Sequence, residues 1–309
     1  MEKTKLIVIL GTTACGKSGL GVTLAGQYSG EIVSADSRQV YRGLDLGTGK
    51  ITPEEMAGIP HYMLDVAEPG TPYSVAQYQQ GAYAAIDAIA ARGHLPFLVG
   101  GTGLYVRAVS EGYVFHAAPP DPVLRSRLEA LSTEALRSEL TALGVTPDAD
   151  AWNNRPRLVR LLEKARNGED PHAESAREPR YDILTLGVSF SRDTVCRRID
   201  QRLLARLDAG MVEEVAALRR QGVSDAFLEG LGLDYRYILR YLQGILPSED
   251  ALIDELGRAI KRFAKRQVSW FKKDKDVHWL DMESNPAAEA AALIDEFLFT
   301  STSHVIFSS

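Results

Sequence analysis

The sequence is poor in the features that mark several large classes of protein. Its two cysteines, Cys15 and Cys196, lie far apart and outside any Cys-x-x-Cys or Cys/His cluster, which argues against a disulfide framework and a zinc finger. Apolar runs are short, and residues 1–10 contain one brief hydrophobic burst, so neither a membrane span nor a removable signal is predicted. We therefore expect a protein of the cytoplasm with no membrane partner.

An excess of positive charge is missing overall but present locally. The 309 residues carry a net charge of −6, which argues against a uniformly basic nucleic-acid binder. Between Arg258 and Lys275, however, eight Lys or Arg stand against one Asp, a local charge of +7, so the rest of the chain carries −13. Because phosphate contacts supply most of the affinity for nucleic acids, this stretch predicts a surface for a polyanion.

The apolar pattern of the first 110 residues predicts an α/β fold. Three short apolar runs are typical of buried strands, and stretches between them have helical periodicity. Such alternation implies a parallel sheet flanked by helices, which binds ligands at the carboxyl ends of its strands. The predicted strands are LIVIL (6–10), EIVSA (31–35) and LPFLV (95–99), and the predicted helices are 17–28 and 74–92.

Prolines at 119, 120 and 122 separate this region from a second one. Residues 123–167 are helical, polar and largely free of strand signal, so we predict a small all-helical insertion over 119–179 within a core formed by 1–118 and 180–309. The other predicted elements are a strand at 182–190, helices from 191 to about 271 with breaks near 221–234 and at Pro247, and a helix at 286–298.

The stretch GTTACGKS follows the first predicted strand and opens the first predicted helix. It fits the phosphate-binding pattern G-x-x-x-x-G-K-[ST] in full and in the expected context. Its N–H groups would cradle an anion, Lys17 would face the outer phosphate, and the Ser18 hydroxyl suits Mg²⁺. The pattern leaves the phosphate compound open, and Cys15 is expected to be a small filler rather than a redox thiol. The predicted phosphate-binding residues are Gly11, Thr12, Thr13, Ala14, Cys15, Gly16, Lys17 and Ser18.

Two further loops leave the same edge of the predicted sheet. The first, DSRQVY from Asp36 to Tyr41, offers a carboxylate, an amide and an aromatic ring, a set that suits a nucleobase amine; the alternative role for Asp36 is a turn or helix cap. The second, GGTGLY from Gly100 to Tyr105, lets the backbone approach a ligand and offers the Thr102 hydroxyl. The strand before it ends without an acid, which counts against an ATP hydrolase.

The basic stretch RAIKRFAKRQVSWFKK predicts an amphipathic helix. Its apolar residues fall on one stripe and most of its cations on the other faces. An ordinary solvated face would intersperse acids, so cations beside two aromatic rings favour a nucleic-acid surface. The predicted stripe is Ile260, Phe263, Ala264, Val268 and Phe271.

Taken together, these stretches resemble the tRNA dimethylallyltransferase (tRNA isopentenyltransferase) family, bacterial type. The matching segments, in family order over about residues 6–280, are GTTACGKS, SADSRQVYRGLDLGTGK, HYMLDVAEPGTPYSVAQY, PFLVGGTGLY, NRPRLVRLLE and AKRQVSWF. The resemblance implies a P-loop NTPase-like core and transfer of a dimethylallyl group from dimethylallyl diphosphate to N6 of the adenosine 3′ of the anticodon, tRNA position 37, in tRNAs reading codons that begin with U. It also implies Mg²⁺ as cofactor and a monomer acting on the anticodon stem-loop.

The same resemblance implies roles for individual residues. Asp36 would take a proton from the adenine N6 amine, Thr102 would lie between donor and acceptor, and Lys17 would stabilise the leaving diphosphate. The reacting base would leave its stack to reach them. The residues expected to contact tRNA are Asp36, Ser37, Arg38, Gln39, Thr102, Arg125, Arg157, Arg160, Lys261, Arg262, Lys265 and Arg266.

One segment departs from the family pattern, and three other hypotheses stay open. Where the family has an Ile-Gly-Tyr-Lys-Glu-like stretch, this chain reads GLGLDYR over 230–236, so the position of an additional diphosphate-binding Arg is open, with Arg236 as a candidate. An adenylate isopentenyltransferase acting on free AMP, ADP or ATP would need neither the insertion nor the basic helix. A small-metabolite kinase conflicts with the missing strand-end acid, and a non-catalytic RNA-binding protein conflicts with the intact Lys17, Asp36 and Thr102.

Overall fold

The structure, a computed structural model, describes residues 3–115, 121–172 and 176–299. The chain divides into two compact units. The core unit comprises Met1–Gly112 and Pro179–Ser309, and the insertion unit comprises Tyr113–Glu178. The insertion predicted from the sequence starts at 119, a residue outside the described ranges, and ends at 179.

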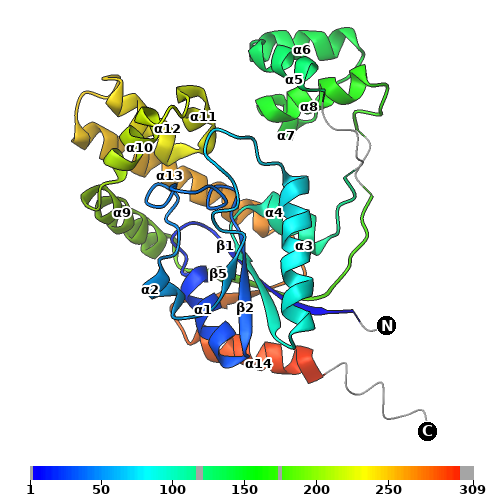
Figure 1. The fold of residues 1–309 in the computed structure, drawn as a ribbon, viewed down its shortest axis with the longest axis vertical. Helices are drawn as coiled ribbons and strands as arrows, with labels where there is room; N and C mark the ends of the chain where they lie inside the picture. The colour runs from blue at the N-terminus through cyan, green and yellow to red at the C-terminus, as the bar shows by residue number, and fades with distance from the viewer. Residues whose placement is uncertain (1–2, 116–120, 173–175, 300–309) are drawn as a thin grey trace. The chain divides into compact units, whose positions relative to one another are not determined.

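The core unit is built on one six-stranded sheet in which all neighbouring strands are parallel, in the order β3-β2-β4-β1-β5-β6 (Figure 1). The predicted α/β class and the four predicted strands are confirmed. Two edge strands were not predicted, because one has two residues and the other has only two buried positions of five instead of an apolar run. The strands are β1 Lys5–Gly11, β2 Gly30–Ala35, β3 His61–Tyr62, β4 Leu95–Gly100, β5 Asp182–Ser189 and β6 Val277–Asp281.

Helices cover both faces of this sheet. In β1, Ile7 and Ile9 pack into one buried apolar cluster, and Leu6 and Val8 pack into the other. This alternation follows from the two-residue period of a strand and leaves β1 buried on both sides. The helices of the first face are α1 (Lys17–Gln27) and α14 (Pro286–Phe299), and those of the second include α3 (Val75–Ala91), α4 (Gly103–Ser110) and α13 (Glu249–Phe271).

The remaining core helices form most of the helical region predicted over 191–271. A further helix interrupts the break predicted near 221–234, because glycines with positive φ, Gly222 and Gly232, end two segments there rather than the whole pattern. None of the helices in the described ranges is long and apolar enough to cross a membrane. The helices of the predicted region are α9 (Arg192–Asp208), α10 (Met211–Arg220), α11 (Asp225–Leu231) and α12 (Leu233–Leu242), together with α13; the short helix α2 (Pro53–Met56) lies between β2 and β3 in the chain.

The insertion unit is a bundle of short helices with its own apolar core. Each helix begins at a side chain that caps its first turn, namely Asp121, Ser132, Asp148 and Asn154. The core comprises Leu128, Leu136, Leu140, Val145, Leu158, Val159 and Leu162. The helices are α5 (Pro122–Ala130), α6 (Thr133–Ala142), α7 (Ala149–Trp152) and α8 (Arg155–Arg166).

Candidate active site at the carboxyl ends of the strands

The P-loop, residues 11–18, joins the carboxyl end of β1 to the first turn of α1. Ala14 and Gly16 have positive φ angles of 59° and 84°, and Gly16 caps α1 without a side-chain hydrogen bond. A backbone of this kind turns successive N–H groups toward one concave side, as in anion-binding nests. Lys17 Nζ donates to the Thr12 carbonyl at 3.2 Å, and the Ser18 side chain is exposed. The loop therefore offers N–H groups, an ammonium and a hydroxyl to an anion.

The three loops predicted to form the site are in direct contact. A Cβ atom on Gly101 would lie 3.5 Å from Lys17 Nζ, so the loop after β4 adjoins the P-loop lysine. Thr102 Oγ1 accepts a hydrogen bond from the Ser37 N–H at 3.0 Å, which joins the same loop to the end of β2. Because β4 lies between β1 and β2, its loop links the other two. The fold thus brings Lys17, Thr102 and Asp36 together at the carboxyl ends of three neighbouring strands, β1, β4 and β2.

Asp36 lies in a tight turn with Arg38. Its Oδ1 accepts the Arg38 N–H at 2.8 Å, which is the turn role considered from the sequence. Burial lowers the pKa of Arg38, with a smaller contribution from Arg236, while Asp36 opposes the shift. A guanidinium stays charged after such a shift because its ordinary pKa is far above neutrality. Arg38 therefore presents a cation beside the Asp36 carboxylate.

Gln39 is tied into the same region by both ends of its amide. Its Nε2 donates to the Gly49 carbonyl at 3.3 Å, and its Oε1 accepts the Ser34 hydroxyl at 3.4 Å. These contacts hold the half-buried Gln39 side chain between Ser34 of β2 and the backbone at Gly49.

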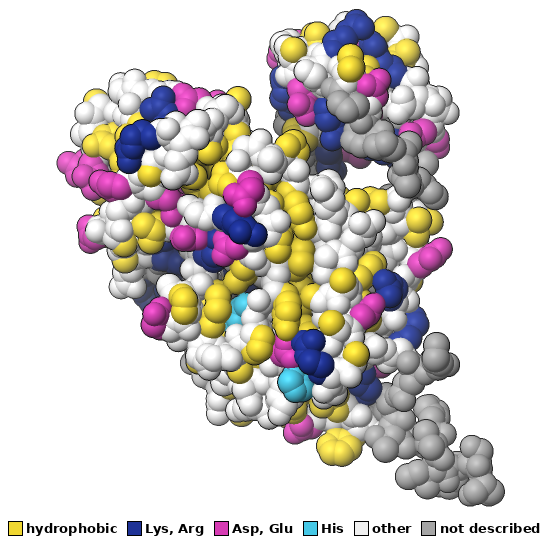
Figure 2. All heavy atoms as spheres, viewed as in Figure 1, with side chains coloured by type: hydrophobic (Ala, Val, Ile, Leu, Met, Phe, Trp, Pro, Cys, Tyr) yellow, Lys and Arg dark blue, Asp and Glu magenta, His cyan; other side chains and the backbone are white. Residues whose placement is uncertain are grey.

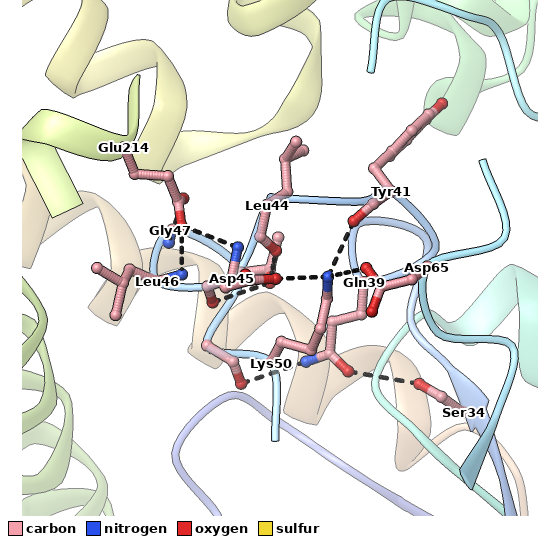
Figure 3. Close-up of polar contacts among 12 residues, drawn as sticks. Ser34, Gln39, Tyr41, Leu44, Asp45, Leu46, Gly47, Lys50, Asp65 and Glu214 are labelled. Carbon is pink, nitrogen blue, oxygen red and sulfur yellow. Dashed lines mark hydrogen bonds and ion pairs between the residues drawn. The ribbon is translucent and has the colours of Figure 1, made fainter. Parts of the chain in front are cut away.

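Lys50 organises that loop from within (Figure 3). Its Nζ donates to the Tyr41 carbonyl at 2.9 Å and pairs with Asp45 at 2.6 Å and Asp65 at 2.5 Å. Only 6% of its side chain is exposed, so the ammonium depends on these partners for its solvation. The sequence offered no reason to single out this lysine, because its partners lie in separate turns.

Glu214 of α10 holds the same loop from the other side (Figure 3). Its Oε2 accepts the N–H groups of Asp45 at 2.9 Å and Leu46 at 2.7 Å, and its Oε1 accepts that of Gly47 at 3.0 Å. The Tyr235 hydroxyl also donates to Oε1, at 2.8 Å. Three consecutive N–H groups on one carboxylate make a rigid connection between α10 and the loop.

Three arginines of α9, Arg198, Arg202 and Arg206, donate hydrogen bonds to backbone carbonyls of these loops, and none of them was predicted from the sequence. They recur every four residues, a spacing that puts side chains on one helix face and that would have been a usable signal. Desolvation by the surrounding protein, followed by repulsion from Arg206, lowers the pKa of Arg202 although its side chain reaches solvent. Their partners are the Ala14 carbonyl for Arg198 (2.8 Å), the Gly49 carbonyl for Arg202 (2.9 Å), and the Leu46 carbonyl (3.1 Å) and Asp234 carboxylate (2.9 Å) for Arg206.

Arg198, and not Arg236, contacts the P-loop. Arg236 donates to the Glu229 carbonyl at 3.0 Å through Nη2 and lies near Arg38, and no hydrogen bond links it to residues 11–18 in the part of the chain that the structure describes. The unusual segment over 230–236 therefore faces the Arg38 side of the site.

The basic stretch forms the second half of α13. Ile260, Ala264 and Phe271 are buried as predicted, whereas Phe263 is 40% exposed and packs with Arg266 at 5.8 Å from its ring centre. Lys261 pairs with Asp200 at 2.7 Å, while Arg262, Lys265 and Arg266 are exposed. On the face of the core unit drawn in Figure 2, basic and acidic side chains are interspersed, whereas the second half of α13, from Arg258 to Phe271, carries five basic side chains and no acidic one.

The three arginines predicted to clasp tRNA from the insertion unit have different surroundings. Arg125 makes two hydrogen bonds of 2.7 Å to the buried carboxylate of Glu163, and Arg160 lies 3.5 Å from the same carboxylate. Arg157 is exposed. Arg125 therefore holds α5 to α8, and a contact with RNA would use only the part of its guanidinium that reaches solvent.

The side chains at the P-loop fit Mg²⁺ only if a bound phosphate compound supplies most of the coordinating oxygen atoms. Within the described part of the chain, no group of three or more His, Cys, Asp or Glu side chains could hold a metal ion. The P-loop contributes the exposed Ser18 hydroxyl beside the N-terminus of α1. Mg²⁺ commonly keeps several waters and binds through phosphate oxygens with few protein ligands, so this site fits a metal carried by a diphosphate.

Comparisons with known proteins agree with this arrangement. The family model described as "IPP transferase" matches residues 39–274, and the one described as "Isopentenyl transferase" matches residues 4–68. The chain is 43% identical over 288 residues to the tRNA dimethylallyltransferase of Exiguobacterium sp., covering 91% of this chain and 92% of that protein. It is 42% identical over 295 residues to tRNA dimethylallyltransferase 2 of Citrifermentans bemidjiense, covering 94% of each.

A solved structure is similar to this chain in both fold and sequence. The fold is similar to that of the full-length tRNA isopentenylpyrophosphate transferase of Bacillus halodurans, with a TM-score of 0.74, 36% identity, and coverage of 97% of this chain and 99% of that one. The resemblance found in the sequence is therefore confirmed. Because relatives above 40% identity cover more than nine-tenths of it and a family model spans most of its length, this chain belongs to the tRNA dimethylallyltransferase family.

Proposed function

We propose that this protein transfers a dimethylallyl group from dimethylallyl diphosphate to N6 of the adenosine at tRNA position 37, in tRNAs reading codons that begin with U. One observation carries the proposal: the P-loop, the Asp36 turn and the Thr102 loop are in contact. Gly101 lies beside Lys17, and the Thr102 hydroxyl accepts a hydrogen bond from the Ser37 N–H. A diphosphate cradle therefore adjoins a carboxylate that can accept a proton.

The reaction exchanges one bond for another. The adenine N6 lone pair attacks C1 of the dimethylallyl group, the C1–O bond breaks, and diphosphate leaves with that electron pair. Asp36 takes the N6 proton, and Lys17 with the P-loop N–H groups stabilises the charge on the leaving diphosphate. Arg198 beside Ala14 is the additional cation that we assign to the diphosphate, in place of Arg236. Bound Mg²⁺, held by Ser18 and diphosphate oxygens, would neutralise part of the same charge.

Contacts with tRNA are assigned to three places: the end of β2, the second half of α13, and Arg157 of the insertion unit. Ser37, Arg38 and Gln39 would contact the target base and its neighbours at the end of β2. Arg262, Lys265 and Arg266 of α13, together with Arg157 of the insertion unit, would contact phosphates, since their side chains are exposed cations. We expect a cytoplasmic monomer acting on the anticodon stem-loop.

The test offers the purified protein magnesium, labelled dimethylallyl diphosphate and either an anticodon stem-loop with three adenosines after its last anticodon base or free AMP. Mass spectrometry of the digested product then locates the label. We expect label on N6 of the adenosine next to the anticodon. Label on AMP alone would move the protein to the adenylate branch, and label on neither acceptor would contradict the proposal.

A further inference from the structure

One side chain of α13 connects the loop that would hold the diphosphate of the donor with the loop that carries Thr102, which would lie between donor and acceptor. We name residues 11–18 the donor loop and residues 100–105 the acceptor loop. Gln267 Oε1 accepts the N–H of Thr13 in the donor loop at 3.2 Å, and Gln267 Nε2 donates to the carbonyl of Gly101 in the acceptor loop at 3.1 Å. Both halves of the amide are used, one on each loop. Thr13 therefore offers its N–H to Gln267, and its hydroxyl is the group left for a ligand.

The helix that carries Gln267 is fixed against the acceptor loop. Trp270, three residues further on, lies so close to Gly103 that a Cβ atom there would be 2.3 Å from its ring. Only glycine permits this approach, and the burial of Ala264 and Phe271 anchors the same helix on either side. Because residues three apart share a helix face, the packing of Trp270 also determines where Gln267 reaches.

An amide is the chemical group that this position requires. A carboxylate could accept the Thr13 N–H but could not donate to the Gly101 carbonyl, and its charge would oppose a diphosphate in the donor loop. A Lys or Arg side chain could donate to the carbonyl but has no atom that accepts the N–H. Asparagine has the same groups on a side chain that is one methylene shorter. The site therefore selects glutamine by length, by charge and by its paired donor and acceptor.

We propose that Gln267 is a positioning residue that sets the spacing between the diphosphate in the donor loop and Thr102 in the acceptor loop. The proposal rests on the proposed function. A reaction between two bound molecules depends steeply on their separation and alignment, so a small change in loop spacing lowers the rate of transfer more than it weakens binding. Through α13, whose exposed cations are assigned to tRNA, the same residue joins the RNA surface to the donor loop.

The test compares Gln267→Met, which keeps the length and volume of the side chain but removes both hydrogen bonds, with Gln267→Glu. Kinetics of prenyl transfer to the stem-loop give kcat and KM, and calorimetric titration with inorganic diphosphate and Mg²⁺ gives the affinity of the donor loop. For Gln267→Met we expect kcat to fall about 10- to 100-fold, with KM for the stem-loop and diphosphate affinity within about threefold of wild type. For Gln267→Glu we expect diphosphate to bind at least about tenfold more weakly, because of charge repulsion.

Ser269→Ala is the matched control, since Ser269 is exposed on the same helix and its hydroxyl donates to the Lys265 carbonyl one turn earlier; it should behave as wild type. An unchanged kcat in Gln267→Met, or a loss confined to KM for the stem-loop, would overturn the proposal. If Gln267→Met does not fold, the titration of Gln267→Glu decides, and diphosphate affinity equal to wild type rejects the assignment. A wild-type protein that binds diphosphate but transfers nothing would instead sink the proposed function, and the titrations would still report whether Gln267 acts on the donor loop.

Discussion

The Asp36 carboxylate accepts the Arg38 N–H and is the proposed base for the N6 proton, and a single substitution separates these two roles. Asparagine keeps an Oδ1 atom that can accept the Arg38 N–H, so the turn should survive in Asp36→Asn, but the amide cannot accept a proton from N6. We expect the rate of transfer to fall about 10²- to 10⁴-fold while the dissociation constant for the stem-loop changes by less than about threefold. Single-turnover kinetics and a filter-binding titration measure the two quantities.

The companion variant Asp36→Ala removes the turn as well. It should lose transfer to the same extent and also weaken stem-loop binding, because Arg38 and Ser37 lose their fixed positions. Equal losses of rate and affinity in Asp36→Asn would exclude Asp36 as the base.

Glu31 lies at the amino end of β2, away from the candidate site, and its ionisation predicts how the stability of the protein depends on pH. Burial opposes its ionisation, but hydrogen bonds from Tyr62, Arg92 and His94 outweigh this and lower the pKa of Glu31 from 4.5 to about 2. A depressed folded-state pKa contributes stability above the unfolded-state pKa, and that contribution is lost as the pH falls from about 4.5 toward 2. We expect Glu31→Gln to lower the free energy of unfolding by about 2 kcal/mol at pH 7 and to flatten its decline below pH 5.

Urea unfolding followed by circular dichroism at pH 7, 5 and 4 measures this effect. Glu68→Gln serves as control, because Glu68 pairs with Arg42 where both side chains are more than 60% exposed, and such pairs contribute little. Parallel loss of stability with falling pH in wild type and Glu31→Gln would show that Glu31 does not supply the acid sensitivity.

At the scale of elements, the loop after β2, from Asp36 to Lys50, is held by one cation, Lys50, and one carboxylate, Glu214. Lys50 supports it from within and Glu214 from α10, and the segment carries the residues assigned to the target base at its start. In Glu214→Gln, an NH₂ group replaces one oxygen and faces backbone N–H donors, so the loop loses part of its connection to α10. We expect KM for the stem-loop to rise about tenfold while KM for dimethylallyl diphosphate stays within about twofold.

The same kinetics on Lys50→Met should give the same pattern, because Asp45 and Asp65 then lose the cation that joins them. Arg42→Gln is a matched control on this loop, since Arg42 is exposed and its partner is Glu68. If Glu214→Gln raised KM for the donor rather than for the stem-loop, the loop would belong to the donor site instead.

At the scale of the whole molecule, the separation of charge predicts how binding depends on salt. Although the net charge is −6, the proposed tRNA contacts use locally clustered cations, above all the +7 stretch from Arg258 to Lys275, so affinity for the stem-loop should fall steeply with salt concentration. Each of Arg262→Gln, Lys265→Gln and Arg266→Gln should reduce the slope of log affinity against log salt by about 1. Titrations at several salt concentrations measure the slope.

Lys261→Gln provides the comparison within the same helix. Its ammonium already pairs with Asp200 at 2.7 Å, so its loss should change the slope less than the loss of an exposed cation. Equal changes of slope at all four positions would mean that the Asp200 pair does not persist in the complex.

The parts of the fold that were predicted are those whose signal is local. The strands β1, β2 and β4 are short, mostly apolar runs that are buried at nearly every position, β5 has four buried positions of eight, and the P-loop is a contiguous motif. The strand β6 was missed because only Val277 and Leu280 of its five residues are buried. Phe263 fits the apolar stripe of α13 by spacing alone, yet it is exposed, because nothing in a helical period specifies how wide the buried stripe is.

The sequence by itself determined the P-loop, the three loops at the sheet edge and the family, because each depends on residues that are close together in the chain. The tertiary structure alone decided which distant side chains complete the site: Gln267 reaches Thr13 across 254 residues, and Glu214 reaches Gly47 across 167. It also decided that Arg198 rather than Arg236 adjoins the P-loop. Such contacts depend on how helices pack on the sheet, and a pattern of residue types along the chain does not encode those distances.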